Sequence, residues 1–119
     1  MAALQVGEEL TVEELLKVLL VHSANDAANV LAVHVGGSID SFASMMNSKA
    51  QELGCKNSHF VNPSGKHEQD HYSTATDIAT IMKYCMQNPT FKSIASSKSC
   101  IIPATNKYEQ RVYTNTNEL

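Results

Sequence analysis

Three helical segments follow one another almost without a gap between Thr11 and Gly54, and this run constrains the fold more than any other feature. Thr11 with Glu14 three positions later is the pattern of a capping box, so we expect the first helix to begin there and to end near His22. The pair Gly36-Gly37 is expected to stop the second helix, and Gly54 the third. Such a run predicts a helical fold.

The starts of the second and third helices are also marked in the sequence. Ser23 is predicted to be the N-cap of the second helix, with Asp26 completing the cap, and Ser38 is predicted to cap the third. The second helix is almost wholly apolar from Ala27 to Val35, so we expect the other helices to pack around it.

The second half of the chain has fewer periodic segments. Residues 55–73 lack periodicity and are expected to form a long connecting loop. A fourth helix should follow, capped by Ser73 or Thr74 and stopped by Asn88-Pro89. A helical turn at 91–95 and short strands at 100–102 and 111–113 complete the expected elements. The predicted fold is mainly α, with about four helices and minor strands near the C-terminus.

Composition bounds the classes of function. The chain has 119 residues, of which 43% are hydrophobic, which fits one domain or less. A formal charge of −3 with a single arginine disfavours nucleic acid as a partner. No apolar run approaches the roughly 20 residues of a membrane-spanning helix, and no secretory signal is recognisable. The spacing of Cys55, Cys85 and Cys100 implies neither a disulfide framework nor a zinc site.

His67-Glu68-Gln69-Asp70-His71 matches H-E-x-x-H, in which two histidines one helical turn apart bind zinc and the glutamate is a general base. That chemistry requires a helix. These residues follow Pro63 and Gly65 and contain no apolar residue that a helix would bury, so we expect them to lie in a loop. A third ligand would have to be a carboxylate such as Asp77 or Glu109, which no motif places.

Ser23-Ala24-Asn25 lies at the junction of the two most apolar helices and has two interpretations. The structural one is that Ser23 is a helix cap. The catalytic one is that a helix start between apolar helices holds a hydroxyl and an amide in a fixed, water-poor place beside a cleft. There the hydroxyl could relay a proton, and the amide of Asn25 could orient a substrate amide.

Seven segments, in this order, resemble the serine D-alanyl-D-alanine carboxypeptidases, which are low-molecular-mass penicillin-binding proteins. They are Leu10–Leu16, Ser23–Asn29, His34–Ser38, Asn57–Pro63, His71–Ala75, Pro103–Asn106 and Thr114–Asn117. The similarity covers nearly the whole chain. It implies the helical subdomain of the β-lactamase and penicillin-binding transpeptidase-like α/β fold.

The resemblance also implies a mechanism. Family members use S-x-x-K for the serine nucleophile and its lysine, S-x-N as a second element and K-T-G as a third. The S-x-N element maps onto Ser23 and Asn25. By this analogy Ser23 is catalytic and relays a proton toward the leaving D-alanine, while Asn25 binds the peptide substrate. The resemblance implies no metal and no cofactor.

The other two catalytic elements are absent from this sequence. None of its lysines has a serine three residues before it, and Lys-Thr-Gly does not occur. We therefore expect residues 1–119 to be a single partial domain that is inactive alone. Because such a piece would expose apolar surface, its self-association is also expected.

The remaining expectations concern the parent enzyme. Its substrate would be a peptidoglycan stem peptide ending in D-Ala-D-Ala, its inhibitors would be β-lactams, and its location would be extracytoplasmic. Two alternatives remain open at this point, a zinc hydrolase built on His67 and His71 and a noncatalytic helical binding module.

Overall fold

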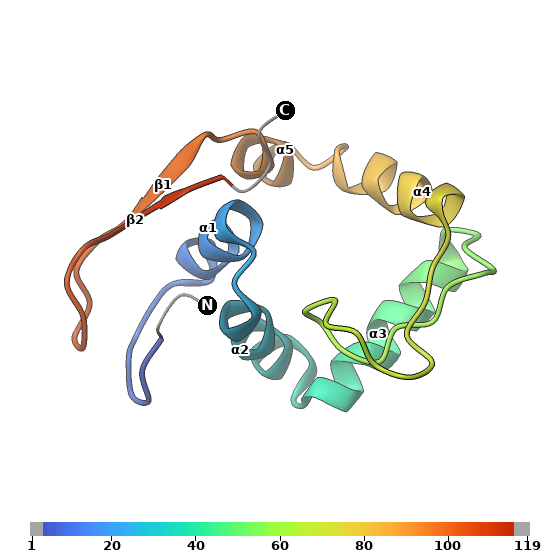
Figure 1. Ribbon diagram of the computed structural model, residues 1–119, viewed down its shortest axis with the longest axis horizontal. Helices are drawn as coiled ribbons and strands as arrows, with labels where there is room; N and C mark the ends of the chain where they lie inside the picture. Colours follow the sequence, from blue (N-terminus) through green and yellow to red (C-terminus); the bar gives the residue numbers. More distant parts are fainter. Residues whose placement is uncertain (1–3, 116–119) are drawn as a thin grey trace.

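Five helices and two short strands make up the computed structural model, which describes residues 4–115 (Figure 1). In chain order they are α1 (Val12–His22), α2 (Asn25–Gly36), α3 (Ile39–Glu52), α4 (Ala75–Cys85), α5 (Pro89–Ala95), β1 (Ser99–Ile102) and β2 (Arg111–Thr114). The prediction of a mainly α chain with minor strands near its C-terminus is confirmed. None of the helices between residues 4 and 115 is long and apolar enough to cross a membrane.

Side chains cap most of the helix starts. The Glu14 backbone N–H donates to the Thr11 hydroxyl at 3.1 Å, and the Thr11 N–H donates to the Glu14 carboxylate at 2.8 Å, which completes the predicted capping box. The Ser38 hydroxyl caps α3 as predicted, and of the two candidates for α4 it is Thr74 that forms the cap. The Asn88 side chain caps α5, a short helix at the predicted helical turn.

Glycines in the left-handed conformation follow two of the helices. Gly37 has a φ of 87° and ends α2, and Gly54 has a φ of 85° just beyond α3. After α3 the N–H of Cys55 donates to the Ala50 carbonyl at 2.8 Å, and the N–H of Gly54 donates to Gln51 at 3.0 Å. This pair of bonds is a Schellman motif, so the predicted C-terminal signal at Gly54 is confirmed.

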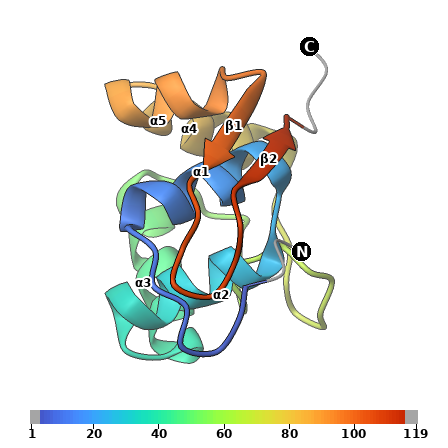
Figure 2. The ribbon, with the colours of Figure 1, turned by 90° about the vertical axis from the view of Figure 1, so that its left-hand side faces the viewer.

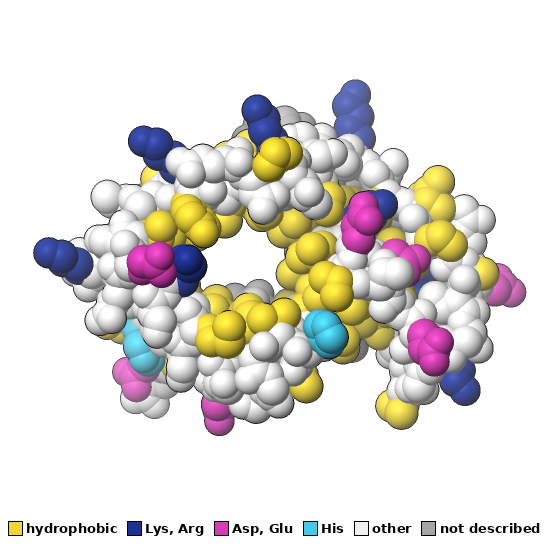
Figure 3. Space-filling model, turned by 180° about the vertical axis from the view of Figure 1, so that it is seen from behind, with side chains coloured by type: hydrophobic (Ala, Val, Ile, Leu, Met, Phe, Trp, Pro, Cys, Tyr) yellow, Lys and Arg dark blue, Asp and Glu magenta, His cyan; other side chains and the backbone are white. Residues whose placement is uncertain are grey.

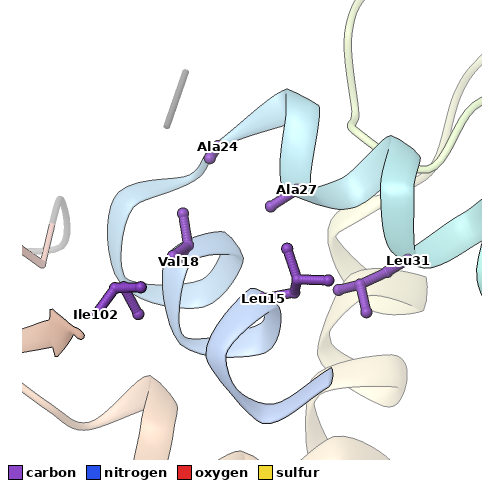
Figure 4. Packing of buried hydrophobic residues seen from close by; sticks show 6 residues of the cluster. All are labelled: Leu15, Val18, Ala24, Ala27, Leu31 and Ile102. Atoms are coloured by element: carbon purple, nitrogen blue, oxygen red, sulfur yellow. The ribbon is translucent and has the colours of Figure 1, made fainter. Parts of the chain in front are cut away.

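The core centres on α1. Figure 4 shows its buried cluster, formed by Leu15, Val18, Ala24, Ala27, Leu31 and Ile102. Helix α1 contacts α2, α5 and both strands. Helix α2 instead leaves Val30, Val33 and Val35 exposed. The expectation that the helices pack around residues 27–35 is therefore wrong, because an almost wholly apolar helix has no polar face from which its solvent side can be identified.

The two strands form an antiparallel hairpin that packs on α1. Ile102 pairs with Arg111 and Cys100 pairs with Tyr113. Ile102 is fully buried while its neighbour Ile101 is 55% exposed, so the strand alternates between a core face and a solvent face. The hairpin thus closes one side of the core around α1.

The elements are arranged around an opening and do not close into a bundle (Figure 1). Hydrophobic side chains line this opening in the space-filling view (Figure 3). Between α3 and α4 lies an almost entirely apolar groove of about 420 Å³, lined by residues that include Phe42, Met45, Ile78 and Tyr84. Met45, Ile78 and Tyr84 are nearly half exposed there. The described residues therefore leave a large apolar surface uncovered.

Candidate active site

The two predicted site residues, Ser23 and Asn25, lie at the junction of α1 and α2. We call residues 23–25 the corner. Helix α1 ends where Ser23 takes the left-handed conformation, with φ 58° and ψ 41°, and donates its backbone N–H to the Leu19 carbonyl at 2.9 Å. This conformation is typical of glycine and costs an L-residue roughly 1–2 kcal/mol. Strain of this kind occurs at functional sites, where the surrounding structure holds it in place.

Ser23 is not the N-cap of α2. Ala24 occupies that position and makes no side-chain capping bond. Because only Ser23 and Ala24 separate the two helices, Ser23 ends α1 and the next residue begins α2. The prediction that Ser23 caps α2 is therefore wrong, and its structural role is instead to end α1.

The corner is anchored by its middle residue. Ala24 is fully buried in the core cluster, whereas Ser23 and Asn25 are both exposed. The Asn25 side chain makes no hydrogen bond to any residue between 4 and 115. The expected water-poor surroundings are thus not found in this chain, but a fixed backbone presents a hydroxyl and an amide on its surface.

An aromatic pair adjoins the corner. The rings of His22 and Tyr113 lie 4.6 Å apart between centroids, so α1 is held to β2 immediately beside Ser23. Burial raises the pKa of the Tyr113 phenol, which therefore stays neutral at physiological pH. One carboxylate oxygen of Asp26 accepts a hydrogen bond from the Leu4 N–H at 3.2 Å, which ties the N-terminal segment to the same corner.

The surroundings of the corner come from distant parts of the chain. Figure 2 shows the link between α1 and α2, the end of β2 and part of the loop after α3 on the same side of the molecule.

The loop between α3 and α4 contains the H-E-x-x-H pattern. Residues 67–71 are not helical, as predicted, and His59 pairs with Tyr72 in an isolated antiparallel bridge. The Nδ1 atom of His71 accepts the Val61 N–H at 3.0 Å, so this nitrogen is engaged in holding the loop. The helix that would place both histidines on one face is not formed. Among the described residues, no three His, Cys, Asp or Glu side chains gather as metal ligands do.

Asp77 anchors this loop to α4. Its buried carboxylate accepts the Ser58 hydroxyl at 2.7 Å and the Asn57 N–H at 3.0 Å. The Ser58 and Ser73 hydroxyl oxygens are 2.6 Å apart, so both ends of the loop are tied to each other and to the first turn of α4. Asp77, considered above as a third zinc ligand, is thus a structural residue with its bonds directed to the loop.

The three thiols, Cys55, Cys85 and Cys100, are free. Burial raises the pKa of Cys55, Cys85 and Cys100, and the charge of Asp77 raises that of Cys55 further. They therefore remain protonated and poorly nucleophilic at neutral pH.

Sequence reasoning missed two residues beside the corner, His22 and Tyr113. No motif marks either residue, and because they are 91 positions apart in the sequence, their spacing does not indicate a contact. The one available signal was the alternation in the strand at 111–113, which predicts that residues 111 and 113 share a face.

Comparison with known proteins connects this corner to a family. The family model described as D-alanyl-D-alanine carboxypeptidase, Peptidase S11, matches residues 1–119. The D-alanyl-D-alanine carboxypeptidase DacF of Bacillus subtilis is 48% identical over 67% of this chain and 21% of its own length. DacB2 of Mycobacterium tuberculosis, another D-alanyl-D-alanine carboxypeptidase, is 37% identical over 95% of this chain and 38% of its own.

A solved structure of a related enzyme has a similar fold. The crystal structure of the Streptomyces K15 DD-transpeptidase superposes with a TM-score of 0.92 at 32% identity, covering 100% of this chain and 49% of that one. The chain thus spans less than half the length of the curated relatives described above and about half of this solved chain. With a family match over its full length and relatives of this identity, the chain belongs to the D-alanyl-D-alanine carboxypeptidase family, peptidase S11.

Proposed function

We propose that this chain is the helical part of a serine D-Ala-D-Ala carboxypeptidase, which removes the terminal D-alanine from peptidoglycan stem peptides through an acyl-enzyme. The observation that carries the proposal is the corner at Ser23 and Asn25. Its backbone is strained at Ser23 and anchored by buried Ala24, and its two polar side chains are exposed in a chain of this family.

Ser23 would act in proton transfer. The nucleophilic serine would lie outside this chain, since no serine here precedes a lysine by three residues. When that serine attacks the peptide carbonyl, its own proton passes to the lysine of S-x-x-K, and the departing D-alanine nitrogen needs a proton. The hydroxyl of Ser23 can donate its proton to that nitrogen while it accepts the proton held by the lysine. Water then hydrolyses the acyl-enzyme.

Asn25 would hold the peptide. Its amide can both donate and accept a hydrogen bond, which matches the N–H and C=O of a peptide backbone. The exposure of this side chain, and its lack of partners within residues 4–115, support this role because the amide need not break an internal bond to bind substrate.

The partial-domain proposal accounts for the uncovered apolar groove between α3 and α4. A monomeric soluble protein rarely leaves a groove like that between α3 and α4 uncovered. The remainder of a chain twice as long, like the solved relative, would supply cover for it. The same surface supports the expectation that the isolated chain self-associates.

The partners and location follow from this function. Substrate would be peptidoglycan stem peptides ending in D-Ala-D-Ala, β-lactams would inhibit as substrate mimics, and the enzyme would work outside the cytoplasm. The zinc alternative is not proposed, because residues 67–71 do not form the helix that its chemistry requires. No feature of the described residues favours a noncatalytic binding module.

Incubation with benzylpenicillin should distinguish the short chain from a longer one. We expect no covalent adduct on residues 1–119, because two of the three catalytic elements are absent. A longer chain that adds S-x-x-K and K-T-G on either side should gain the mass of one penicillin. Intact-mass spectrometry reads both outcomes, and a penicillin adduct on the short chain would contradict the proposed division of catalytic elements.

A further inference from the structure

A buried ion pair joins the two ends of the described chain. The Nη2 atom of Arg111 donates to both carboxylate oxygens of Glu8, at 2.8 and 2.7 Å. The Glu8 side chain is 1% exposed and the Arg111 side chain 5% exposed. Arg111 is the only arginine of the sequence, and its partner lies 103 residues away. Desolvation of both charges opposes a pair buried to this degree. Only Nη2 of the guanidinium bonds to Glu8, and among the described residues the buried Nε and Nη1 atoms have no hydrogen-bond partner.

The loop of the hairpin adds further bonds to the same segment. The Thr105 hydroxyl donates to Glu8, and the Asn106 amide donates to the Gly7 carbonyl at 2.9 Å. The amide oxygen of Asn106 accepts the Glu9 N–H at 2.8 Å. We call this set of contacts the latch, and Figure 2 shows the N-terminal segment beside the hairpin that it joins.

The charge state of the latch is set by its contacts. Burial alone would raise the pKa of Glu8, but the hydrogen bonds from Thr105 and Arg111 outweigh burial and lower it below its ordinary value. Glu8 is therefore ionised at neutral pH. The guanidinium of Arg111 also lies 4.1 Å from the centre of the Tyr108 ring, which holds it from a second side.

Strand β2 connects the latch to the candidate site. Successive side chains of a strand alternate between its faces, so Arg111 and Tyr113 share a face while exposed Val112 lies on the other. Arg111 is fixed by Glu8, and Tyr113 stacks on His22, the residue immediately before Ser23. A displacement of Arg111 would therefore be transmitted along two residues of strand to the ring that adjoins Ser23.

We propose that Glu8 and Arg111 are positioning residues, which hold β2 so that Tyr113 packs on His22 and the corner at Ser23 keeps its geometry. They do not touch substrate. The structural part of the inference stands on the described contacts alone, and its catalytic consequence rests on the function proposed above.

Glu8→Gln tests the structural part in the 119-residue chain. The substitution keeps the size of the side chain and removes its charge. We expect the His22 ring resonances to move toward their values in an unstructured peptide, and amide exchange in β1 and β2 to rise on the order of tenfold or more. Exchange in α3 should be unchanged. Glu13→Gln is the matched control, because it removes an exposed ion pair with Lys17 on α1 and should alter neither signal.

Two outcomes would overturn the structural part. One is an unchanged His22 signal in Glu8→Gln, and the other is equally faster exchange in α3 and the hairpin, which would show a loss of overall stability only. If Glu8→Gln does not fold, Asn106→Ala removes two bonds of the latch and leaves the ion pair. The same shift at His22, in a smaller amount, is then expected, and its absence counts against the latch.

The longer enzyme tests the catalytic part by its rate of penicillin acylation. We expect Glu8→Gln to slow acylation on the order of tenfold to a hundredfold, as small misplacements of catalytic groups do, and Glu13→Gln to leave it unchanged. Acylation of Glu8→Gln at the wild-type rate would refute the positioning role while leaving the proposed function intact. If the wild-type longer enzyme is not acylated, the proposed function fails. The His22 resonances of Glu8→Gln would still test whether the latch holds β2 in place.

Discussion

Replacement of Ser23 by alanine in the longer enzyme is expected to lower the turnover of D-alanine release by about 100- to 10,000-fold, the range associated with a positioned proton-transfer group. The hydroxyl is the only group removed. Because Ser23 is exposed and does not cap α2, its loss should change the free energy of unfolding by no more than about 0.5 kcal/mol. Release of D-alanine and urea unfolding measure the two effects separately.

Ser23→Gly is the control that separates backbone from hydroxyl. Glycine adopts the left-handed conformation of residue 23 without steric cost, so the free energy of unfolding should stay the same or rise by up to about 1 kcal/mol. Turnover should fall as far as in Ser23→Ala, since both variants lack the hydroxyl. Full turnover in either variant would reduce Ser23 to the residue that ends α1.

Ile102→Ala should cause a large loss of stability. Ile102 is fully buried, in the cluster with Leu15 and Val18 of α1. Truncation of a buried isoleucine removes transfer free energy and leaves a cavity, together about 2–5 kcal/mol. Urea unfolding of the 119-residue chain, followed by circular dichroism, gives the change.

The adjacent residue provides the matched control. Ile101→Ala removes the same atoms from the same strand, but its side chain is 55% exposed, so we expect a loss within about 0.5 kcal/mol. Equal losses in the two variants would show that the hairpin does not pack on α1 as described.

Local signals in the sequence were sufficient for most element boundaries. Thr11 with Glu14, Ser38 and Gly54 each act through bonds to residues within a few positions, so their effect can be predicted from spacing. Ser23 shows where this fails. A serine before a helix suggests an N-cap. Here the preceding helix ends at the same place, so Ser23 is the C-cap of α1 and Ala24 is the N-cap of α2.

The packing of the chain required contacts that spacing does not reveal. The central role of α1 depends on the hairpin and α5 reaching it from the other end of the chain. Glu8 and Arg111 lie 103 positions apart, and nothing in the sequence indicates which of its acidic residues pairs with its single arginine. Ser23 and Asn25 could be predicted from the family resemblance. The contact between His22 and Tyr113 is known only from the distance between their rings in the structure.

The most direct test of the proposed function is the release of D-alanine from a peptide ending in D-Ala-D-Ala by the longer enzyme, measured with benzylpenicillin or a zinc chelator present. The proposed function predicts release that penicillin abolishes, that the chelator leaves unchanged and that Ser23→Ala reduces at least about a hundredfold. Release that resists penicillin, stops with the chelator, or proceeds at the wild-type rate in Ser23→Ala would contradict it.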